Sequence, residues 1–390
     1  MTNQTCHWLA RLVGHPTVST APNMPLIAEL ETALTDAGAV CTRIADTAGQ
    51  KASLAARLGP DLPGGLMLSG HVDVVPAEGQ AWTVPPFQMT ERGDLLYGRG
   101  TADMKGFVAC MAALAERFGG HVLSRPLWLA ISYDEEVGCI GVRPMLDDFV
   151  KRDIRPDLVV VGEPTSMRRG MGHKGKIAFS VRATGAPRHS SEAPLALNAL
   201  HLAAEFVTAM RQLQDEISAN GPSEAGYTVP HATVHVGKLQ GGTALNLVPD
   251  SAELEMELRF LAADDADALA DWIRNMAAAI VAPYRANFPY ADLTVRETVR
   301  YPGLSADSSL PAQQRFSSCL PPDTEECKLS FGTEGGLFSE RLQVPVVVCG
   351  PGSIEQAHRP DEYISKSQLA ACDAMLDACV EKFCIIGGGQ

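Results

Sequence analysis

Histidine and carboxylate residues recur along this chain in a combination suited to binding divalent cations. The set consists of His71, Asp73, Asp103, Glu135, Glu136, Glu163 and His358. Imidazole nitrogens and carboxylate oxygens are the ligands that zinc and neighbouring transition metals accept in hydrolytic sites. Two histidines and three carboxylates, with one further carboxylate left free as a base, are the groups that a pair of divalent ions requires. These residues therefore predict a dinuclear hydrolytic centre.

The spacing within two of these groups predicts a division of roles. On an extended chain, residues separated by one position point to the same side, so Asp73 can accept a hydrogen bond from one nitrogen of His71 and orient the ring. Glu135 and Glu136 are adjacent, so on a strand they would point in opposite directions, and one could bind metal while the other acts as a base. Taken singly, each residue has a structural alternative, and Asp103 could be a helix N-cap.

Four short apolar runs are placed to carry these side chains. They cover residues 65–73, 126–136, 157–164 and 344–352. The runs are continuous rather than alternating, which is typical of strands buried on both faces of a parallel sheet. Helical patterns over 24–38 and 104–118 separate strands, so we expect a doubly wound α/β domain with a mixed sheet.

The ends of these runs carry the polar residues. The first three end at His71, at residues 134–136 and at Glu163, while His358 follows the fourth after a short turn. Asp103 directly precedes the helical pattern at 104–118. Open α/β sheets bind ligands at the carboxyl ends of their strands. We therefore expect the candidate ligands to gather at one edge of the sheet.

The middle of the chain has a different periodicity. Apolar and polar residues alternate over 176–184, 233–241 and 251–260, which predicts an antiparallel sheet with one solvated face. Helical patterns accompany these strands over 195–214 and 265–282. We therefore expect an α+β domain at 175–299, inserted into an α/β domain formed by 1–174 and 300–390.

Composition excludes several classes of function. The 390 residues include 46 acidic and 32 basic ones, and the net charge of -14 does not favour binding to nucleic acid or an anionic membrane. The ten cysteines form no C-x-x-C pair, and several lie in apolar runs, which indicates reduced thiols rather than a disulfide framework. We see no signal peptide and no apolar run of about 18 residues, so we expect a cytoplasmic protein.

The segment GMGHKGK at 170–176 matches two nucleotide-binding patterns only superficially. Its glycines fit the dinucleotide fingerprint, and Lys176 nearly completes a P-loop. Both patterns require a helix to follow, whereas a strand with period-two alternation follows here, and Ile177 occupies the Ser/Thr position of the P-loop. We interpret the segment as a glycine-rich turn into the inserted domain.

As an ordered set, these motifs resemble the metal-dependent peptidase and deacylase family that contains acetylornithine deacetylase, succinyl-diaminopimelate desuccinylase, carboxypeptidase G2 and aminoacylase. The resemblance covers almost the whole chain and is carried by SGHVDVVP, YGRGTADMKG, YDEEVGC, VVGEP, RHSS, LNLVPD and AHRPDEY. Within the family, SYDEEVGCIG and FGTEGGLF are most similar to acetylornithine deacetylases. The resemblance implies that the α/β domain is catalytic and that the inserted domain mediates dimerisation.

The resemblance also implies a role for each motif residue. It implies that His71 and Glu163 bind one ion, that Glu136 and His358 bind the other, and that Asp103 bridges both. The implied cofactors are two divalent cations, Zn2+ or Co2+. By the same resemblance Glu135 is the catalytic base, and Asp73 orients the first histidine.

Other matches concern the partner subunit and the substrate. His189 in RHSS is similar to the family histidine that reaches a neighbouring subunit's active site to stabilise the oxyanion, which implies a homodimer. Asn246 and Arg259 resemble substrate-contacting positions, although a structural ion pair is an open alternative for Arg259. Thr333 and Glu334 in FGTEGG are further candidates for substrate binding. Glu334 would pair with the side-chain ammonium of ornithine, or else it is a solvated loop carboxylate.

The implied reaction is hydrolysis of the amide of an N-acyl amino acid, with N2-acetyl-L-ornithine giving L-ornithine and acetate. Two cations would share a water, and Glu135 would take its proton and later deliver it to the departing amine. A desuccinylase or a broader N-acyl amino acid hydrolase is the main alternative. A metal-holding binding protein without turnover is a remote one, because binding metal does not require a free base such as Glu135.

Overall fold

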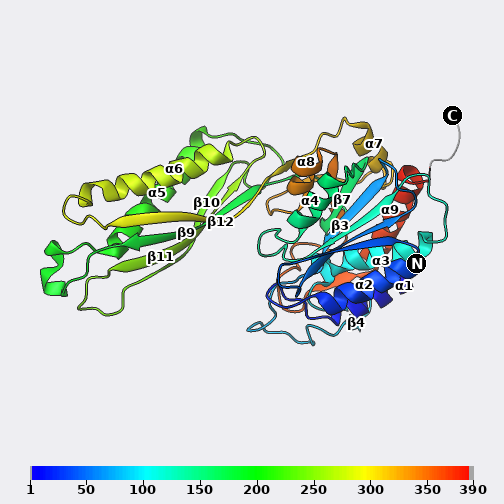
Figure 1. Ribbon diagram of the computed structural model, residues 1–390, viewed down its shortest axis with the longest axis horizontal. Coiled ribbons are helices and arrows are strands. Elements are labelled where there is room, and N and C mark those ends of the chain that lie inside the picture. The colour runs from blue at the N-terminus through cyan, green and yellow to red at the C-terminus, as the bar shows by residue number, and fades with distance from the viewer. Residues whose placement is uncertain (1, 386–390) are drawn as a thin grey trace. The chain divides into compact units, whose positions relative to one another are not determined.

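The computed structural model describes residues 2–385 and divides the chain into two compact units (Figure 1). The first unit comprises Met1–Gly172, Leu304–Lys328 and Thr333–Gln390. The second comprises His173–Gly303 and Leu329–Gly332. All candidate metal ligands belong to the first unit, which the chain leaves and re-enters around the second.

A mixed sheet of nine strands forms the centre of the first unit within the described residues, in the order β1-β2-β6-β3-β7-β15-β8-β13, with β14 paired to β8. Its strands are β1 (Val40–Ala45), β2 (Ala52–Leu58), β3 (Leu66–His71), β6 (Leu127–Ser132), β7 (Leu158–Pro164), β8 (Arg169–His173), β13 (Leu304–Ser305), β14 (Glu326–Leu329) and β15 (Val346–Gly350). The four predicted strands are confirmed as the neighbours β6, β3, β7 and β15, which run parallel. Every residue of these four is buried, as their continuous apolar sequences predict.

Helices cover both faces of this sheet, as expected for a doubly wound fold (Figure 1). On one face α3 packs on β3 and β7 and is covered in turn by α1 and α9, while α2 packs beside it on β1 and β2. On the other face α4 packs on β2 and α8 on β7 and β15. The helices are α1 (Thr2–Val13), α2 (Met24–Asp36), α3 (Gly106–Phe118), α4 (Val142–Lys151), α7 (Pro311–Ser317), α8 (Gly335–Leu342) and α9 (Lys366–Phe383).

A small antiparallel sheet flanks the main one. Its strands are β4 (Thr90–Arg92), β5 (Leu95–Tyr97) and β16 (Tyr363–Ser365), in the order β16-β5-β4. The pairing of β16 with β5 brings the segment after His358 beside the segment before Asp103. Two stretches distant in sequence are thereby fastened together next to the candidate ligands.

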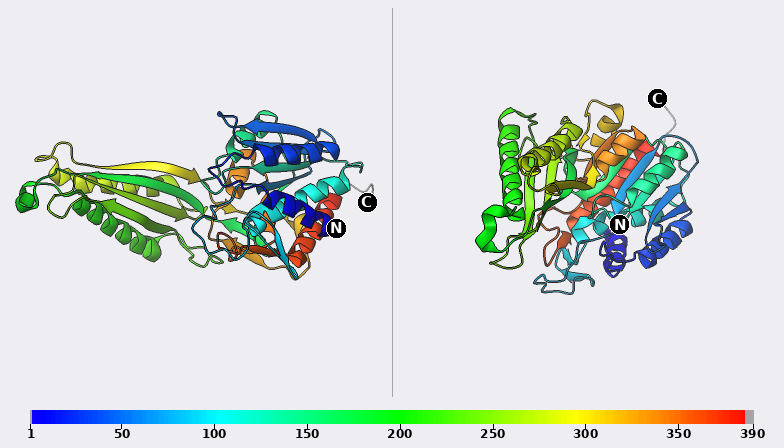
Figure 2. Two further views of the ribbon diagram at one scale, coloured as in Figure 1. Left: turned by 90° about the horizontal axis from the view of Figure 1, so that it is seen from below. Right: turned by 60° about the vertical axis from the view of Figure 1, so that its left-hand side comes forward.

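The second unit is an antiparallel sheet with two helices on one side (Figure 2). Its four strands, all within the described chain, are β9 (Gly175–Thr184), β10 (Thr233–Gly241), β11 (Ser251–Phe260) and β12 (Asp292–Tyr301), in the order β10-β11-β9-β12. The helices are α5 (Ala199–Asn220) and α6 (Ala266–Val281), whose first turns are capped by Asn198 and Asp265. Buried and less buried residues alternate along β9 and β11, so the predicted period-two pattern and the α+β class are confirmed.

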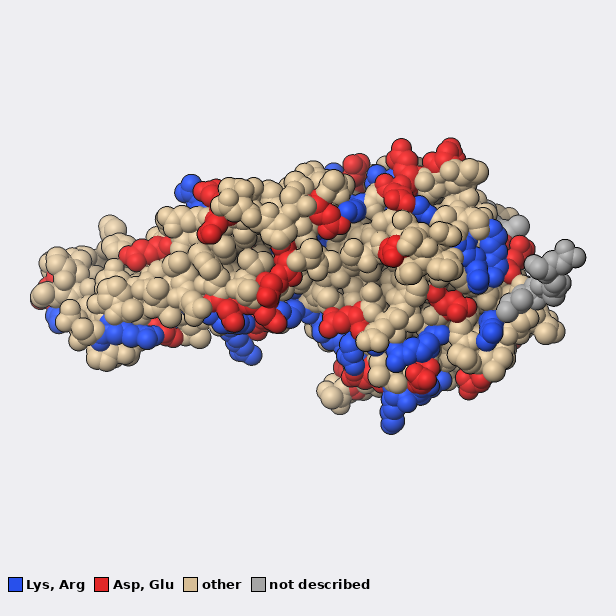
Figure 3. Space-filling model, turned by 90° about the horizontal axis from the view of Figure 1, so that it is seen from above, with Lys and Arg blue, Asp and Glu red and all other residues tan. Residues whose placement is uncertain are grey.

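On the face drawn in Figure 3, charge is mixed rather than dominated by one sign, and basic side chains lie next to acidic ones. Ion pairs between exposed side chains also occur, such as Arg182–Glu253 and Arg274–Asp271. No helix within residues 2–385 is both long enough and apolar enough to cross a membrane.

Candidate metal centre

Side chains from five segments of the first unit converge at one end of its parallel strands. His71 is the last residue of β3, and Glu163 lies at the end of β7. Asp103 lies in the segment Thr101–Lys105 directly before α3, and its φ of -125° and ψ of 96° are not helical. Glu136 follows β6, and His358 lies between β15 and β16. The structure thus brings these residues together at the carboxyl ends of the strands, as predicted.

Asp103 occupies the middle of this cluster. Its Oδ1 lies 3.2 Å from Nε2 of His71, and its Oδ2 lies 3.2 Å from Nε2 of His358. The two histidines therefore face opposite oxygens of one carboxylate. Asp103 is 6% exposed, so this carboxylate is nearly withdrawn from solvent.

A second carboxylate accompanies each histidine. Oε1 of Glu163 lies 4.0 Å from Nε2 of His71, and Oε1 of Glu136 lies 3.0 Å from Nε2 of His358. Two sets of three ligand atoms also lie mutually within 4.8 Å, namely His71, Glu135 and Glu163, and His71, Asp103 and Glu136. The cluster thus offers oxygen and nitrogen donors on both sides of Asp103.

Asp73 organises the segments around it through its carboxylate. The ring Nδ1 of His71 lies 3.0 Å from the Asp73 carbonyl and 3.4 Å from its Oδ1, which leaves Nε2 to face the cluster. Oδ1 accepts the backbone N–H of Glu135 at 3.0 Å, and Oδ2 accepts that of Glu136 at 3.3 Å. Oδ2 also accepts the hydroxyl of Ser19 at 2.8 Å. One buried carboxylate therefore orients a candidate ligand and both neighbouring glutamates.

Glu135 and Glu136 do not lie on a strand, so the expectation that strand alternation separates them is wrong. Strand β6 ends at Ser132, and the chain turns at Asp134, which has a positive φ of 54°. Lys51 donates to both oxygens of Asp134 at 2.7 and 2.9 Å and thereby fixes this turn. Asp134 itself is paired in this way and is not part of the metal cluster.

His189 and Asn246 lie side by side in the second unit. The backbone N–H of Ser190 donates to the Asn246 carbonyl at 2.9 Å, and His189 pairs with Leu247 in an isolated bridge. Nδ1 of His189 accepts the N–H of Ser191 at 3.3 Å, so the neutral ring carries its proton on Nε2. His189 and Asn246 are both exposed.

Arg259 forms the structural ion pair that the sequence left open as an alternative. Its Nε and Nη2 donate to the two carboxylate oxygens of Glu257 at 3.1 and 3.3 Å, and Nη1 donates to the Tyr301 hydroxyl at 3.2 Å. Lys176 contacts the same carboxylate at 3.1 Å. The guanidinium is thus occupied by partners within its own unit.

Thr333 and Glu334 lie in the interior of the first unit. The Thr333 hydroxyl accepts the N–H of Gly335 at 2.9 Å at the start of α8. Glu334 is 1% exposed and accepts the hydroxyl of Ser69 at 3.1 Å, so it is not the solvated loop carboxylate of the alternative interpretation. Its negative charge is one of the groups that raise the pKa of Glu135.

Comparison with known proteins identifies the family. The model of peptidase family M20/M25/M40 matches residues 67–382. The chain belongs to this family. Acetylornithine deacetylase of Aliivibrio fischeri is 32% identical over 86% of this chain and 85% of its own length. That of Erwinia tasmaniensis is 34% identical over 82% of this chain and 81% of its own.

Solved structures share the fold at low sequence identity. Aminopeptidase PepT from Bacillus cereus has a TM-score of 0.74 at 17% identity and covers 98% of both chains. The M20 metallo-carboxypeptidase Sso-CP2 from Sulfolobus solfataricus has a TM-score of 0.77 at 16% identity, over 97% of this chain and 99% of its own. The predicted fold class is confirmed, and the chain is a metal-dependent amidohydrolase that hydrolyses amides of acyl amino acids.

The charges and pKa values of the candidate metal ligands are suited to binding cations. Burial raises the pKa of Glu163 well above its usual range, and the charges of Asp103 and Glu135 add to this effect. Hydrogen bonds with Asp103 and Glu136 raise the pKa of His358 to about 10. Without bound cations, the protein therefore offsets the negative charge of its buried carboxylates by retaining protons. A divalent cation would displace these protons. The donor set of imidazoles and carboxylates suits zinc, cobalt or manganese.

The pKa of Glu135 is shifted upward in the metal-free protein. Burial raises its pKa to about 8, and repulsion from Glu136 and Glu334 acts in the same direction against the opposing effect of His71. A carboxylate tuned toward neutral pH can both accept and return a proton. Since cations would add positive charge nearby, they would lower this pKa from its value in the metal-free protein.

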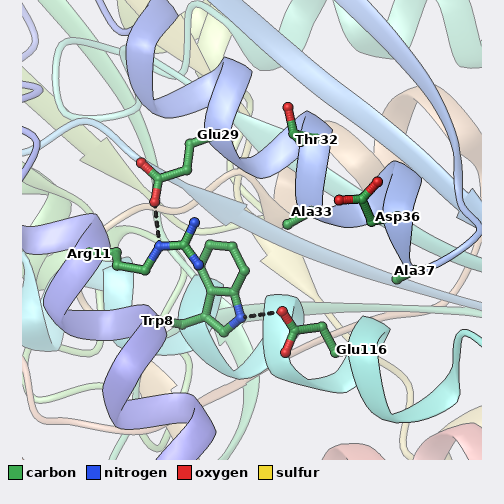
Figure 4. Close-up of a pocket in the computed structure, with 8 residues that line it drawn as sticks. All are labelled: Trp8, Arg11, Glu29, Thr32, Ala33, Asp36, Ala37 and Glu116. Carbon is green, nitrogen blue, oxygen red and sulfur yellow. Dashed lines mark hydrogen bonds and ion pairs between the residues drawn. The ribbon is translucent and has the colours of Figure 1, made fainter.

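A pocket remote from the cluster is not a candidate active site. It encloses about 540 Å3 and is lined by residues of α1, α2 and α3 (Figure 4). Four of its polar residues are paired, through the hydrogen bond from Trp8 to Glu116 at 3.0 Å and that from Arg11 to Glu29 at 2.5 Å. The lining residues include no candidate metal ligand.

Sequence patterns did not identify the side chains that support the cluster. Ser19 and Lys51 hold Asp73 and Asp134, and Arg99 and Glu362 lie beside Asp103 and His358. Arg99 and Glu362 do belong to the motifs YGRGTADMKG and AHRPDEY. Their charged character in otherwise well-packed segments was the one available signal.

Proposed function

We propose that this chain is an acetylornithine deacetylase, which hydrolyses N2-acetyl-L-ornithine to L-ornithine and acetate. The carboxylate of Asp103, flanked by His71 and His358 with Glu135 beside them, carries this proposal. The names of the curated relatives, at 32 and 34% identity, support the choice of substrate. Succinyl-diaminopimelate desuccinylation and broader N-acyl amino acid hydrolysis are the competing activities.

The proposed ligands divide between the two ions on either side of Asp103. His71 and Glu163 would hold one ion, Glu136 and His358 the other, and Asp103 both. The separate approach of the two histidines to Oδ1 and Oδ2, each at 3.2 Å, supports a bridging role. We propose Zn2+ or Co2+ as the ions. When bound, they supply a Lewis acid for the scissile carbonyl and lower the pKa of the attacking water.

Glu135 is the proposed proton carrier. It takes the proton of the attacking water and later delivers it to the amide nitrogen, so that the amine leaves as a neutral group. Asp73 keeps Glu135 in position by accepting its backbone N–H, and it keeps the His71 ring oriented. The reaction consumes one water and leaves the carboxylate unprotonated again at its end.

We propose that the second unit mediates a homodimer and carries His189 to the partner's site. Because Nδ1 of His189 accepts the Ser191 N–H, Nε2 is the ring nitrogen that could donate to an oxyanion. Exposed leucines on the same segments support an interface, namely Leu195, Leu245 and Leu247 at 62, 102 and 43% exposure. Asn246, adjacent to His189, is proposed to contact the substrate in the same region.

The substrate roles of the remaining candidates differ in their support. Arg259 would have to exchange Glu257 for a substrate carboxylate, and its existing bidentate ion pair favours the structural role. Thr333 and Glu334 are 0 and 1% exposed, so their proposed contact with substrate requires access to the interior beside Glu135. The ion pair between Glu334 and the ornithine ammonium stays a prediction.

Amine release by the purified protein, loaded with zinc or cobalt and compared with a chelated sample, tests the function. The panel comprises N-acetyl-ornithine, N-acetyl-citrulline, N-acetyl-methionine and N-succinyl-diaminopimelate. Metal-dependent turnover strongest on N-acetyl-ornithine is the expected result. Turnover led by another compound would keep the reaction and replace the substrate, whereas silence across the panel with two ions bound would contradict the proposed activity.

Subunit complementation tests the role of His189. His189→Ala and Glu135→Ala should each be inactive alone, but a mixed dimer would combine an intact Glu135 with an intact His189 at one of its sites. Random reassortment should then restore about a quarter of the wild-type rate, because half of the dimers are mixed and each has one complete site. No recovery after demonstrated subunit exchange would refute the shared site.

A further inference from the structure

Two charged residues outside the proposed ligand set are fully buried beside it. Arg99 follows β5, Glu362 precedes β16, and each is 1% exposed. Nη1 of Arg99 donates to Oε2 of Glu362 at 2.8 Å. Burial of a charged pair carries a desolvation cost, so further hydrogen bonds are needed to stabilise it. Arg99 also donates to the Pro76 carbonyl at 3.3 Å, and most of the other bonds of the pair lead toward segments that carry candidate ligands.

The carboxylate oxygen of Glu362 that does not contact Arg99 binds the segment of Asp103. Its Oε1 accepts the backbone N–H of Ala102 at 2.9 Å and that of Asp103 at 3.1 Å. The carbonyl of Glu362 also accepts the N–H of Gly98 at 2.9 Å. Because Asp103 faces both histidines with its two oxygens, the orientation of its backbone decides whether both contacts form together.

Arg99 holds the loop of His358 in the same way. Its Nη1 donates to the carbonyl of Arg359 at 3.3 Å, and its Nη2 donates to the side-chain oxygen of Gln80. The amide of Gln80 in turn donates to the carbonyl of His358 at 3.0 Å. The backbone carbonyls of His358 and Arg359 are therefore both anchored through Arg99, the first by way of Gln80.

His358 depends on this anchoring more than His71 does. The side chain of His358 is 47% exposed, and its backbone has a positive φ of 63°, which is unfavourable for a residue other than glycine. His71 is 1% exposed, and its strand is hydrogen-bonded between β6 and β7. Packing of the strand fixes His71, whereas hydrogen bonds from other segments fix His358.

We propose that Arg99 and Glu362 are positioning residues for the metal centre, and that this buried pair holds Asp103 and His358 in the orientation in which both can bind one ion. The inference rests on the proposed dinuclear site. It assigns a function to a charged pair that touches neither substrate nor ion. It also predicts that the ion bound by His358 is the one that weakens when the pair is changed.

Titration of the metal-free protein with Co2+, monitored by calorimetry and visible absorption, tests the proposal. Glu362→Gln keeps the shape of the side chain but turns a donor toward Arg99. It should weaken one of the two Co2+ equivalents by about 10–100-fold, which is the usual effect of changing a residue that orients a metal ligand. The other equivalent should change less.

Asp373→Asn is the matched control. Asp373 is also a carboxylate of 1% exposure, accepts the Thr5 hydroxyl at 2.7 Å and lies 3.5 Å from Arg117, but it contacts none of the proposed ligands. This variant should lose thermal stability and still bind both Co2+ equivalents as the wild type does. A merely structural Glu362 would behave like Asp373, so two unchanged equivalents in Glu362→Gln would overturn the proposal.

Gln80→Ala provides the second test if Glu362→Gln does not fold. It removes the bond to the His358 carbonyl and the acceptor of one Arg99 Nη2 hydrogen bond, but it keeps the Arg99–Glu362 ion pair itself. It should weaken the same Co2+ equivalent by about tenfold. Gln314→Ala, which loses a comparable bond to the Ser309 carbonyl at 3.2 Å, is its control. Equal Co2+ affinities in these two variants would refute the inference. A wild-type protein that binds no Co2+ would refute the dinuclear site itself.

Discussion

Replacing Asp73 by asparagine should weaken both the fold around the cluster and the reaction. The carboxylate is 2% exposed and accepts the N–H groups of Glu135 and Glu136 as well as the Ser19 hydroxyl. An asparagine has only one oxygen, so its amino group must face some of these donors. Since the Ser19 hydroxyl can rotate to accept, the amino group should turn toward it, and the Glu136 N–H then faces another donor.

The magnitude follows from these contacts. One hydrogen bond to a charged acceptor is lost, and its partly buried N–H is left unpaired, which together cost about 3 kcal/mol. For a unit of this size the thermal midpoint should fall by about 5–10 °C. Because Glu135 and His71 lose part of their orientation, kcat for N-acetyl-ornithine should fall by about 10–100-fold.

Asp134→Asn is the control for this variant. Asp134 lies in the same turn and pairs with Lys51, but its carboxylate does not contact the cluster, and asparagine tolerates its positive φ. Calorimetric unfolding with and without zinc, together with steady-state kinetics, should separate the two variants. If Asp73→Asn retained its midpoint within about 1 °C and its kcat within about twofold, the reasoning from these hydrogen bonds would be wrong.

Three further predictions concern other residues of the chain. Glu135→Ala should keep its metal content, measured by atomic absorption, and lose about 10²–10⁴-fold in kcat, and a variant that retains more than about a tenth of the rate would remove Glu135 from the role of base. Burial lowers the pKa of His173 from 6.5 to about 4, so between these pH values the unfolded chain binds a proton that the folded chain does not. Stability should therefore fall by up to about 3 kcal/mol on acidification through this window, and His173→Gln should lose that dependence in urea unfolding, whereas parallel curves would contradict it. If Glu334 binds the ornithine ammonium, Glu334→Gln should reduce the preference for N-acetyl-ornithine over N-acetyl-methionine by about tenfold or more, and an unchanged preference would exclude the ion pair.

The central part of the fold follows directly from the sequence because its signals are local. Continuous apolar runs predict β3, β6, β7 and β15, since strands buried on both faces have no polar side. The edge strand β1 escaped prediction, because it is exposed or half-buried and resembles a loop in composition. Its neighbour β2 was also missed, although it is largely buried. Strand β12 was also missed, although TVRETVRY alternates in the same way as its neighbours.

The candidate site divides along the same line. His71 and Glu163 lie on strands, so their position at the edge of the sheet could be predicted. The turn that carries Glu135 and Glu136 depends on the Asp73 carboxylate, which accepts the backbone N–H of Glu135, and on the Lys51–Asp134 ion pair. Contacts between segments so distant in sequence leave no periodicity to detect.

The interrupted path of the first unit has a consequence for how the protein forms during synthesis. The second unit is continuous from His173 to Gly303 apart from the short return at Leu329–Gly332, so most of it emerges from the ribosome as one piece. His358 and Glu362 emerge near the end. Until then Asp103 can face His71 but lacks its second histidine, His358, and the Glu362 carboxylate that binds its backbone. We expect the second unit to fold on the nascent chain, since domains fold as units in order of completion. The cluster of candidate ligands should be completed only after the chain is released from the ribosome. In truncated nascent chains that end before residue 358, the second unit should then resist proteolysis, whereas the ion proposed for Glu136 and His358 should not be retained.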